Sequence, residues 1–399
     1  MKGLATHDAP TRKTKKCPFR WLPLLLIISV FGFYHFQYLK SDEIPSDPLE
    51  RARFLINHHP LIDTHNDLPW SIRNRKDDVL NVTVLPSSFH TDIVRMREGG
   101  LTGQIWSAYI GCEKDLTKKG DFILKTLQQI DIVKQLIKDN PDFAYAAEAD
   151  DIISLFKQGK ISSLIGIEGG HQIDDSLEAL RMYYDLGVRY MTLTHGCHTN
   201  WADSASMPPL HNGLTDFGIK IVKEMNRIGM MVDISHVSHK TMRDVIKATR
   251  APLFASHSSS ASLCPTERNM PDDVLLAMKE LDGVVMINFW PNLISCSSKA
   301  TLSQVADHIS YISNLVGPEH VGFGGDFDGI DVVTEGLEDV SKYPYLVAEL
   351  IKRGFSDKDV VNIMGANLIR VLKKTELIAK EMTNVPIDRT RIEFPKTCQ

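Results

Sequence analysis

The stretch Leu61–Trp70, LIDTHNDLPW, opens with an apolar pair and breaks into polar residues before Pro69. A short apolar run bounded by turn-forming residues predicts a buried β-strand, on which successive side chains alternate between faces. His65 and Asp67 should therefore project to the same side where the strand ends. An imidazole and a carboxylate so placed are suitable metal ligands, although a His-x-Asp triplet alone is also typical of a turn with a capping aspartate.

The same arrangement of apolar run, polar tip and helical stretch recurs along the chain. Apolar residues at three- and four-residue steps predict amphipathic helices over Phe122–Lys138 and Leu214–Ile228, and two closing helices over Tyr345–Arg353 and Val360–Lys373. Strands that alternate with helices pair in parallel, and eight of them close a (β/α)8 TIM-type barrel. The eight strand candidates are Leu61–Thr64, Gln104–Ile110, Ser163–Ile167, Val188–Leu193, Met230–Ile234, Pro252–Ala255, Val284–Phe289 and Val321–Gly324.

Six of the eight predicted strands end in His, Asp or Glu. In a barrel of this type the active site lies at the carboxyl ends of the strands. Ionisable groups are costly to bury unless they are paired or bound to metal, so matched positions at so many tips indicate a shared site. The tip residues are His65, Asp67, Glu168, His171, His195, His236, His257, Asp326 and Asp328.

The best ligand candidates combine nitrogen and oxygen donors without thiolates. They are His65, Asp67, Glu168, His236 and His257. Such a set favours zinc or a similar divalent ion over calcium, and its size fits two ions that share a carboxylate. A pair of zinc ions lowers the pKa of a bridging water, which gives hydroxide at neutral pH. The alternative is five separately hydrogen-bonded core or turn residues.

Three further residues are candidates for contact with substrate. Asp326 would orient the water and take its proton, and His195 would donate to the oxyanion of an attacked carbonyl. Asp326 could instead form a turn, and His195 could be a structural histidine near Trp201. Arg268, in the loop CPTERNMPDD, could form a surface salt bridge or bind a substrate carboxylate with both nitrogens. We expect structural or solvent-facing roles for His171, His198, His211 and His239.

The chain has 399 residues, of which 43% are hydrophobic and 24% charged, and a net charge of -5. This is a globular composition, and the absence of a basic stripe beyond the N-terminus argues against nucleic acid as a partner. Residues 1–20 are basic, and Trp21–Tyr38 contains no charged residue. We therefore expect a cytoplasmic tail over 1–20 and a signal-anchor over 21–39, with a cleaved signal peptide as the alternative.

Residues after this segment would lie outside the cytoplasm. We predict a linker over 40–50, the barrel with its metal site over 51–380 and a C-terminal tail over 381–399. Asn81-Val82-Thr83 is a glycosylation sequon in a polar loop. Cys17 would be cytosolic, and the remaining cysteines suggest two disulfides and one thiol for pairing between chains, or else small buried hydrophobes. These cysteines are Cys112, Cys197, Cys264, Cys296 and Cys398.

The motifs resemble those of the membrane (renal) dipeptidases, a binuclear zinc family. The resemblance covers about residues 50 to 380 in order, through LIDTHNDLPW, IGIEGGH, YMTLTHGCHTNWAD, VDISHVS, ASHSS, RNMPDD and GFGGDFDG. It implies a metal-dependent dipeptidase that releases the C-terminal residue of a dipeptide. Familiar vertebrate members end in a hydrophobic lipid-anchor signal, whereas this chain stops at Cys398-Gln399. We therefore expect attachment through the N-terminal segment, at the cell surface, or else secretion.

The resemblance also implies individual roles. It implies that one zinc ion binds His65 and Asp67, that the second binds His236 and His257, and that Glu168 bridges them. It implies substrate contacts for His195, Arg268 and Asp326. It further implies disulfides Cys112–Cys197 and Cys264–Cys296, and a homodimer joined through Cys398.

Two rival functions remain for comparison. One is a different amidohydrolase-type metal hydrolase on the same scaffold, acting on cyclic amides or phosphoesters. Arg268 distinguishes this hydrolase from a dipeptidase, because a dipeptidase needs a cationic residue that binds the substrate carboxylate. The other rival is a non-catalytic cell-surface adhesion protein, against which the intact ligand set argues.

Overall fold

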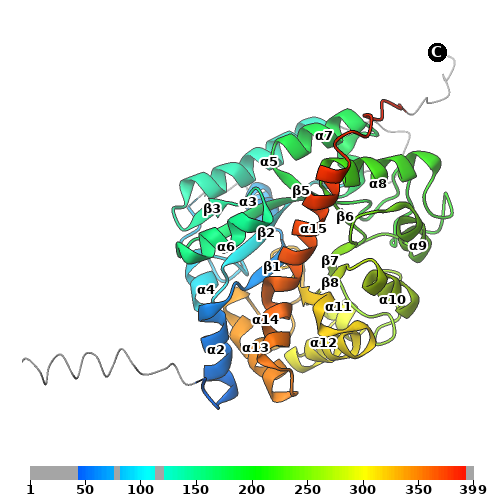
Figure 1. Ribbon diagram of the computed structural model, residues 1–399. Coiled ribbons are helices and arrows are strands. Elements are labelled where there is room, and N and C mark those ends of the chain that lie inside the picture. Colours follow the sequence, from blue (N-terminus) through cyan, green and yellow to red (C-terminus); the bar gives the residue numbers. More distant parts are fainter. Residues whose placement is uncertain (1–43, 76–80, 113–120, 392–399) are drawn as a thin grey trace, which may run out of the picture. The chain divides into compact units, whose positions relative to one another are not determined.

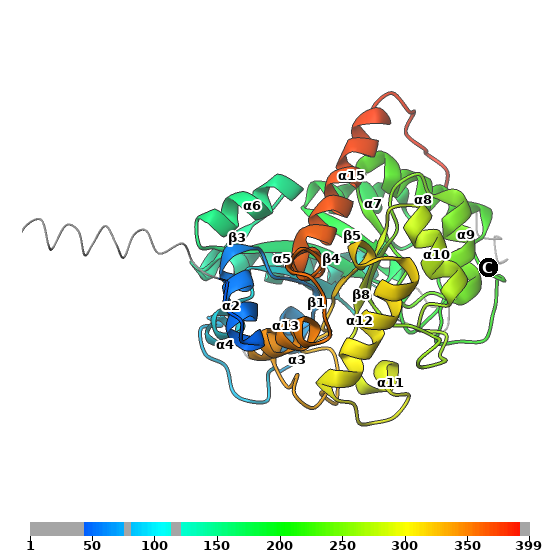
Figure 2. The ribbon, with the colours of Figure 1, turned by 60° about the horizontal axis from the view of Figure 1, so that its bottom comes forward.

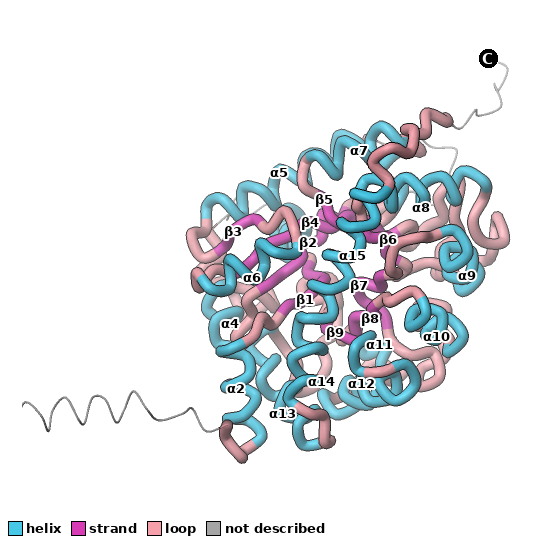
Figure 3. The backbone as a smooth tube through the Cα atoms, viewed as in Figure 1, coloured by secondary structure: helices cyan, strands magenta, loops and turns pink. Residues whose placement is uncertain are grey.

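The computed structural model describes residues 44–75, 81–112 and 121–391 (Figure 1). Its strands form one parallel sheet, drawn in magenta in Figure 3. The strands are β1 (Ile62–Asn66), β2 (Gly103–Tyr109), β3 (Phe143–Tyr145), β4 (Ile161–Glu168), β5 (Val188–Thr192), β6 (Met231–Asp233), β7 (Phe254–Ser258), β8 (Val284–Ile287) and β9 (Val321–Phe323).

Eight of these strands close a barrel. Pairing runs from β1 through β2, β4, β5, β6, β7, β8 and β9, and β9 pairs back to β1. Each matches a predicted strand, which confirms the (β/α)8 barrel. Strand β7 continues to Ser258, so His257 lies inside the strand and not beyond its end as predicted.

Helices surround the barrel (Figures 1 and 2). The predicted helix Phe122–Lys138 is α5, and the helix predicted to end before Gly229 is α8, which Gly229 caps with a φ of 89°. The helices are α2 (Pro48–His58), α3 (Leu68–Arg75), α4 (Ile93–Glu98), α5 (Phe122–Asp139), α6 (Ala149–Lys157), α7 (Leu177–Asp185), α8 (Asp216–Ile228), α9 (His239–Ala248), α10 (Asp272–Glu280), α11 (Pro291–Ile294), α12 (Leu302–Val316), α13 (Tyr343–Lys352), α14 (Asp357–Val361) and α15 (Asn367–Glu381). The chain also contains three short 3₁₀ turns and one π-helical turn within the described residues. They are η1 (Gly170–Ile173), η2 (Pro318–His320), η3 (Val340–Lys342) and the π-helical η4 (Asn362–Ala366).

Two details were not predicted: the start of α2 inside the expected linker, and strand β3. The predicted linker over 40–50 ends earlier, because α2 starts at Pro48, where the Asp47 side chain accepts the backbone N–H groups of Leu49 and Glu50. Strand β3 was not predicted, because three residues are too few to show a period. It pairs with the first three residues of β4, and β5 pairs with β4 further along.

Helix α15 closes the amino end of the barrel, and Figure 1 shows it crossing in front of the strands. Leu368, Val371 and Leu372 of α15 belong to one buried cluster with side chains from the barrel interior, among them Ile62, Phe254 and Val284. This apolar packing fills one end of the barrel. The polar strand tips therefore gather at the opposite, carboxyl end.

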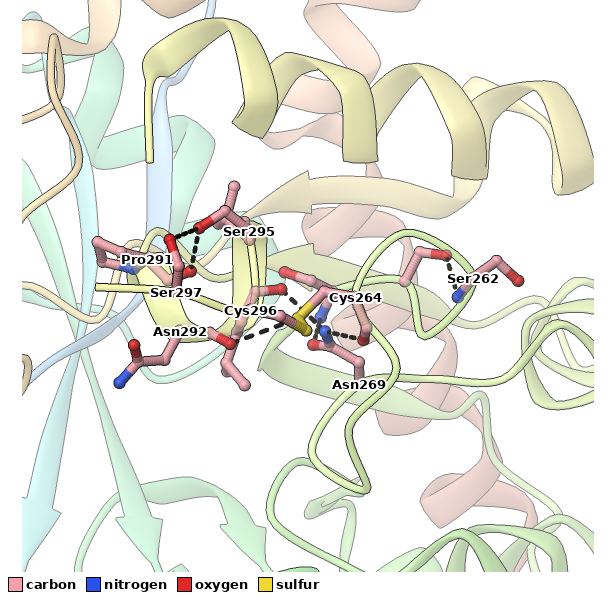
Figure 4. The surroundings of a disulfide bond; sticks show 12 residues. Ser262, Cys264, Asn269, Pro291, Asn292, Ser295, Cys296 and Ser297 are labelled. Carbon is pink, nitrogen blue, oxygen red and sulfur yellow. Dashed lines mark hydrogen bonds between the residues drawn. A yellow bond between two sulfur atoms is a disulfide. The ribbon is translucent and has the colours of Figure 1, made fainter. Parts of the chain in front are cut away.

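Two disulfides brace loops at the carboxyl end, and they are the pairs that the resemblance implies. Cys112–Cys197 joins the loops after β2 and β5, and Cys264–Cys296 joins the loops after β7 and β8. Figure 4 shows Asn269 beside the second disulfide, where its amide donates to the carbonyl of Cys264 at 2.9 Å. The disulfide thus links the loop that carries Arg268 to the loop after β8.

No helix within the described ranges is both long and apolar enough to cross a bilayer. The expected cytoplasmic tail over 1–20, the expected anchor over 21–39 and the expected interchain Cys398 lie outside the described residues.

Candidate metal centre

The five predicted ligands meet at the carboxyl end of the barrel. Nε2 of His65 lies 3.2 Å from Asp67 Oδ2 and 3.4 Å from Glu168 Oε1. The same Glu168 oxygen lies 3.1 Å from Nε2 of His236 and 3.3 Å from Nε2 of His257. Glu168 therefore belongs to two neighbouring groups, one with His65 and Asp67 and one with the two histidines.

The donor atoms of these groups fit bound cations. Nε2 of His65 and Oδ1 of Asp67 are buried and make no hydrogen bond of acceptable geometry within the described chain, although His65 lies close to two carboxylates. Buried polar atoms are nearly always satisfied by a partner. Nε2 atoms of His236 and His257 lie only 2.9 Å apart. An ion at each group would satisfy these atoms.

The electrostatics of Glu168, His236 and His257 agree with ligand chemistry. Burial would raise the pKa of Glu168, but the nearby His65 and His195, with the rings of His236 and His257 beside the carboxylate, hold it well below its usual value. Burial lowers the pKa of both His236 and His257 well below 6.5. The carboxylate is thus charged and these imidazoles are neutral, which are the forms that bind metal.

Asp326 and His195 stand beside the ligands. Oδ1 of Asp326 lies 3.8 Å from Nε2 of His65, and its Oδ2 accepts the amide of Asn288 at 2.9 Å. Burial, with Asp67 and Glu168 nearby, raises the pKa of Asp326 to about 7. His195 does not pack on Trp201. Its ring lies 4.2 Å from that of His236 and 4.7 Å from that of Tyr109.

Arg268 forms no surface salt bridge. Its guanidinium contacts the Ser258 hydroxyl and the carbonyl of His257, each at 3.3 Å, and no carboxylate of the described residues lies within ion-pair distance. Burial lowers its pKa to about 10, so the group stays charged at neutral pH. A charged guanidinium without an acidic partner is suited to an anionic ligand.

These groups line a pocket of about 390 Å³. Its floor is polar, with Asp67, Glu168, His195, His236, Arg268 and Asp326, and its wall is largely aromatic and apolar, with Trp70, Tyr109, Trp290 and Ile330. A few convergent polar groups within an apolar wall are typical of a small-molecule site.

Four further histidines and Asp328 make contacts that hold the loops together. His171, His198, His211 and His239 each contact a backbone carbonyl through Nε2, and none lines the pocket. Asp328 accepts the backbone N–H of His90 at 2.8 Å. This agrees with the structural roles expected for the four histidines, and it makes Asp328 a loop residue.

Comparison with known proteins decides the family. Residues 49–386, nearly the whole of the described chain, match the membrane dipeptidase family, peptidase family M19. The chain belongs to this family. Its members are metallopeptidases, so the metal-suited donor set and the pocket belong to a metallodipeptidase, a hydrolase that cleaves dipeptides.

Individual relatives agree with this membrane dipeptidase assignment. The chain is similar to the dipeptidase aclJ of Aspergillus oryzae, with 44% identity over 360 residues, 87% of this chain and 85% of that protein. It is also similar to an uncharacterised dipeptidase of Schizosaccharomyces pombe, with 41% identity over 96% of both chains. The solved structure of dipeptidase AC, a metallopeptidase of family M19, has a TM-score of 0.73 and 25% identity, covering 79% of this chain and 98% of that one.

Among the residues of this membrane dipeptidase site that sequence reasoning missed, two lie at strand tips. They are Tyr109 and Asn288, at the tips of β2 and β8, the two barrel strands whose tips carry no His, Asp or Glu. Tyr109 packs on His195, and Asn288 holds Asp326. The only signal in the sequence was a polar amide directly after the apolar run that ends at Ile287. Tyr109 gave no signal, because an aromatic residue is ordinary in a strand.

Proposed function

We propose that this metallodipeptidase works with two zinc ions. His65, Asp67 and Glu168 would hold one ion, and Glu168, His236 and His257 would hold the other. The observation that carries the proposal is the position of Glu168 Oε1, which lies 3.1–3.6 Å from four imidazole Nε2 atoms. A carboxylate shared between imidazole groups is the arrangement that a two-ion site needs, and neutral imidazoles with carboxylates suit zinc.

The protein's own residues would position the substrate. Arg268 pairs with the C-terminal carboxylate of the dipeptide, which places the peptide bond over the ligand cluster. Bound zinc would supply Lewis acidity that polarises the scissile carbonyl and lowers the pKa of water toward about 7. His195 donates a hydrogen bond to the carbonyl oxygen as negative charge develops there.

Asp326 would move the proton. Its Oδ2 is held by Asn288, which leaves Oδ1 to accept a proton from the attacking water. A pKa of about 7 suits both this step and the later donation to the leaving amine. The products are the N-terminal residue and a free C-terminal amino acid.

Metal content and hydrolysis of Gly-Leu by purified residues 41–399 test the proposal. We expect about two zinc ions per chain, as a two-ion site requires. A chelator should abolish turnover, and added zinc should restore it. Chelator-insensitive hydrolysis would contradict the proposal.

Arg268→Ala separates a dipeptidase from another amidohydrolase-type enzyme. We expect KM for Gly-Leu to rise at least about tenfold, because a charge-assisted pair to the carboxylate is lost. KM for the C-terminal amide of Gly-Leu should not change. The control is Arg243→Ala, which removes an exposed guanidinium paired with Asp273. An equal change in KM for both substrates in Arg268→Ala would favour the rival hydrolase. A cell-surface role that is unchanged in Glu168→Gln would favour the adhesion protein.

We also propose that the enzyme acts outside the cytoplasm, held by the segment over 21–39 and joined as a homodimer through Cys398. The two disulfides support an oxidising compartment. Asn81 is exposed, as a glycan would require, and Thr83 donates its hydroxyl to the Asn81 side chain at 2.7 Å. Glycosidase treatment should lower the mass of the wild type but not that of Asn81→Gln. The enzyme should stay with the membrane after an alkaline wash. On non-reducing gels it should run as a dimer that a reductant separates.

A further inference from the structure

A buried carboxylate outside the proposed ligand set lies behind His257. Asp233 is fully buried at the end of β6, and no cation of the described chain forms an ion pair with it. Its Oδ1 accepts the backbone N–H groups of Ser235 at 3.0 Å and Ser256 at 2.9 Å. Its Oδ2 accepts the hydroxyls of Thr192 and Ser256, both at 2.6 Å. Four donors thus satisfy the oxygen atoms of the Asp233 side chain.

These contacts determine which nitrogen of His257 carries hydrogen. Ser256 has one hydroxyl hydrogen, and the short bond to the Asp233 carboxylate uses it. Ser256 Oγ also lies 2.7 Å from Nδ1 of His257, so Oγ must accept the hydrogen of that nitrogen. A neutral imidazole has only one N–H, so Nε2 keeps its lone pair. That lone pair faces Glu168 at 3.3 Å.

The same carboxylate supports the second histidine of this group. Ser235, whose N–H Asp233 accepts, directly precedes His236. His236 has a φ of 63°, a left-handed conformation that a non-glycine residue adopts only when its surroundings impose it. Asp233 therefore anchors the turn that points the His236 ring at Glu168.

We propose that Asp233, acting through Ser256, is the positioning residue that presents Nε2 of His257 to a metal ion. The inference rests on the proposed metal centre. Asp233 and Ser256 are not ligands in that centre and would act through His257. Outer partners of this kind orient the ring, fix its tautomer and raise metal affinity.

Zinc affinity, measured by chelator competition, tests the inference on the purified enzyme. In Ser256→Ala, Nδ1 of His257 loses its acceptor, and we expect one of the two zinc ions to bind about 10- to 100-fold more weakly. Ser256→Thr keeps the hydroxyl and should restore the affinity. Thr192→Val is the matched control, because it removes a hydroxyl bond of the same length to the same Asp233 oxygen without touching His257.

Asp233→Asn gives a second, stricter test. Two backbone N–H groups face Oδ1, so the new NH₂ group must lie on the side of the hydroxyls. It would donate to Ser256, whose hydrogen would then turn to Nδ1 of His257 and leave Nε2 protonated. We expect zinc binding to fall at least as far as in Ser256→Ala.

The outcomes separate the two proposals. A wild-type chain that binds no zinc would overturn the metal centre and this inference with it. Full zinc affinity in Ser256→Ala or Asp233→Asn, with a loaded wild type, would overturn this inference alone. An equal loss in Thr192→Val would also overturn it, because the effect would then be general destabilisation of the site.

Discussion

At the scale of single residues, Gly329 lets the site close around its carboxylates. A Cβ at this position would lie 2.2 Å from Asp67 Oδ2 and 2.7 Å from Asp326 Oδ1. No neighbouring side chain could give way without moving a proposed ligand. The missing side chain is therefore part of the site.

Gly329→Ala should displace both carboxylates. We expect zinc affinity to fall at least about tenfold, with a matching loss of kcat/KM, because ligand positions tolerate little movement. Chelator competition and dipeptide hydrolysis measure the two effects. Gly111→Ala is the control, because a Cβ there meets nothing within 4 Å of the described structure. Unchanged zinc affinity in Gly329→Ala would contradict the prediction.

His171 should make the fold sensitive to acid. Burial lowers its pKa from 6.5 to about 4, so between these values the unfolded chain binds a proton that the folded chain does not. Stability therefore falls as pH drops from 6.5 toward 4, by at most about 3 kcal/mol from this residue. His171→Gln keeps a donor for the Ile110 carbonyl and removes the titration.

The measurement is urea denaturation of zinc-loaded wild type and His171→Gln at pH 7, 6 and 5. We expect the stability of the variant, relative to wild type, to rise as the pH falls. Parallel curves for the two proteins would show that His171 does not titrate in this window.

At the scale of elements, two strands deliver their functional side chains through strained turns. His236 follows β6 and Asp326 follows β9, with φ values of 63° and 62°. Non-glycine residues hold this conformation when the surrounding structure imposes it. Because β6 and β9 are parallel, both turns lie at the carboxyl end of the barrel, beside the proposed ligands. The strained backbone thus holds His236 and Asp326 in position before substrate binds.

The Cys264–Cys296 disulfide should act on substrate binding. Asn269, next to Arg268, donates to the carbonyls of Cys264 and Leu293, which binds the Arg268 loop to the disulfide-linked loop after β8 (Figure 4). Replacing both cysteines by serine should destabilise the fold by about 2–4 kcal/mol. KM for dipeptides should rise more than kcat falls.

Steady-state kinetics and denaturation measure these changes. The comparison variant replaces Cys112 and Cys197 by serine, which removes a disulfide attached to the loop of His195 instead. That variant should lose stability as well, but its main kinetic effect should be on kcat. A larger KM effect in the comparison variant would contradict the link to Arg268.

At the scale of the whole molecule, the barrel has two unlike ends. Helix α15 packs an apolar cluster into the amino end, while Asp67, Glu168 and Asp326 lie close together at the other. Carboxylates this near one another repel when no cation lies between them. Bound metal should therefore stabilise the whole fold.

Removing the metal should lower Tm. A ligand that binds only the folded chain adds about 2.7 kcal/mol at a concentration 100 times its Kd. Thermal unfolding of chelated and zinc-loaded protein measures the gain. Glu168→Gln removes the shared carboxylate, so its Tm should depend much less on zinc. Equal Tm values for chelated and loaded wild type would contradict a zinc site in the folded barrel.

Patterns in the sequence are enough to predict the barrel and most of the residues at the ends of its strands. Alternating and helical periods are local, so apolar runs predicted all eight barrel strands and the helices α5 and α8. Polar residues directly after those runs then marked His65, Glu168, His236 and the other candidates, because the fold itself places strand ends together. A very short strand and the exact start of a helix were not predicted, as β3 and the start of α2 show.

The contacts by which the candidate residues support one another are visible only in the folded chain. Among the described residues, no carboxylate lies at ion-pair distance from Arg268, Asn288 holds Asp326, and Asp233 contacts His257 through Ser256. These contacts join residues on different strands, and no local pattern encodes them. They exist because closing the barrel brings the ends of distant strands within hydrogen-bond distance, where each buried polar atom must find a partner.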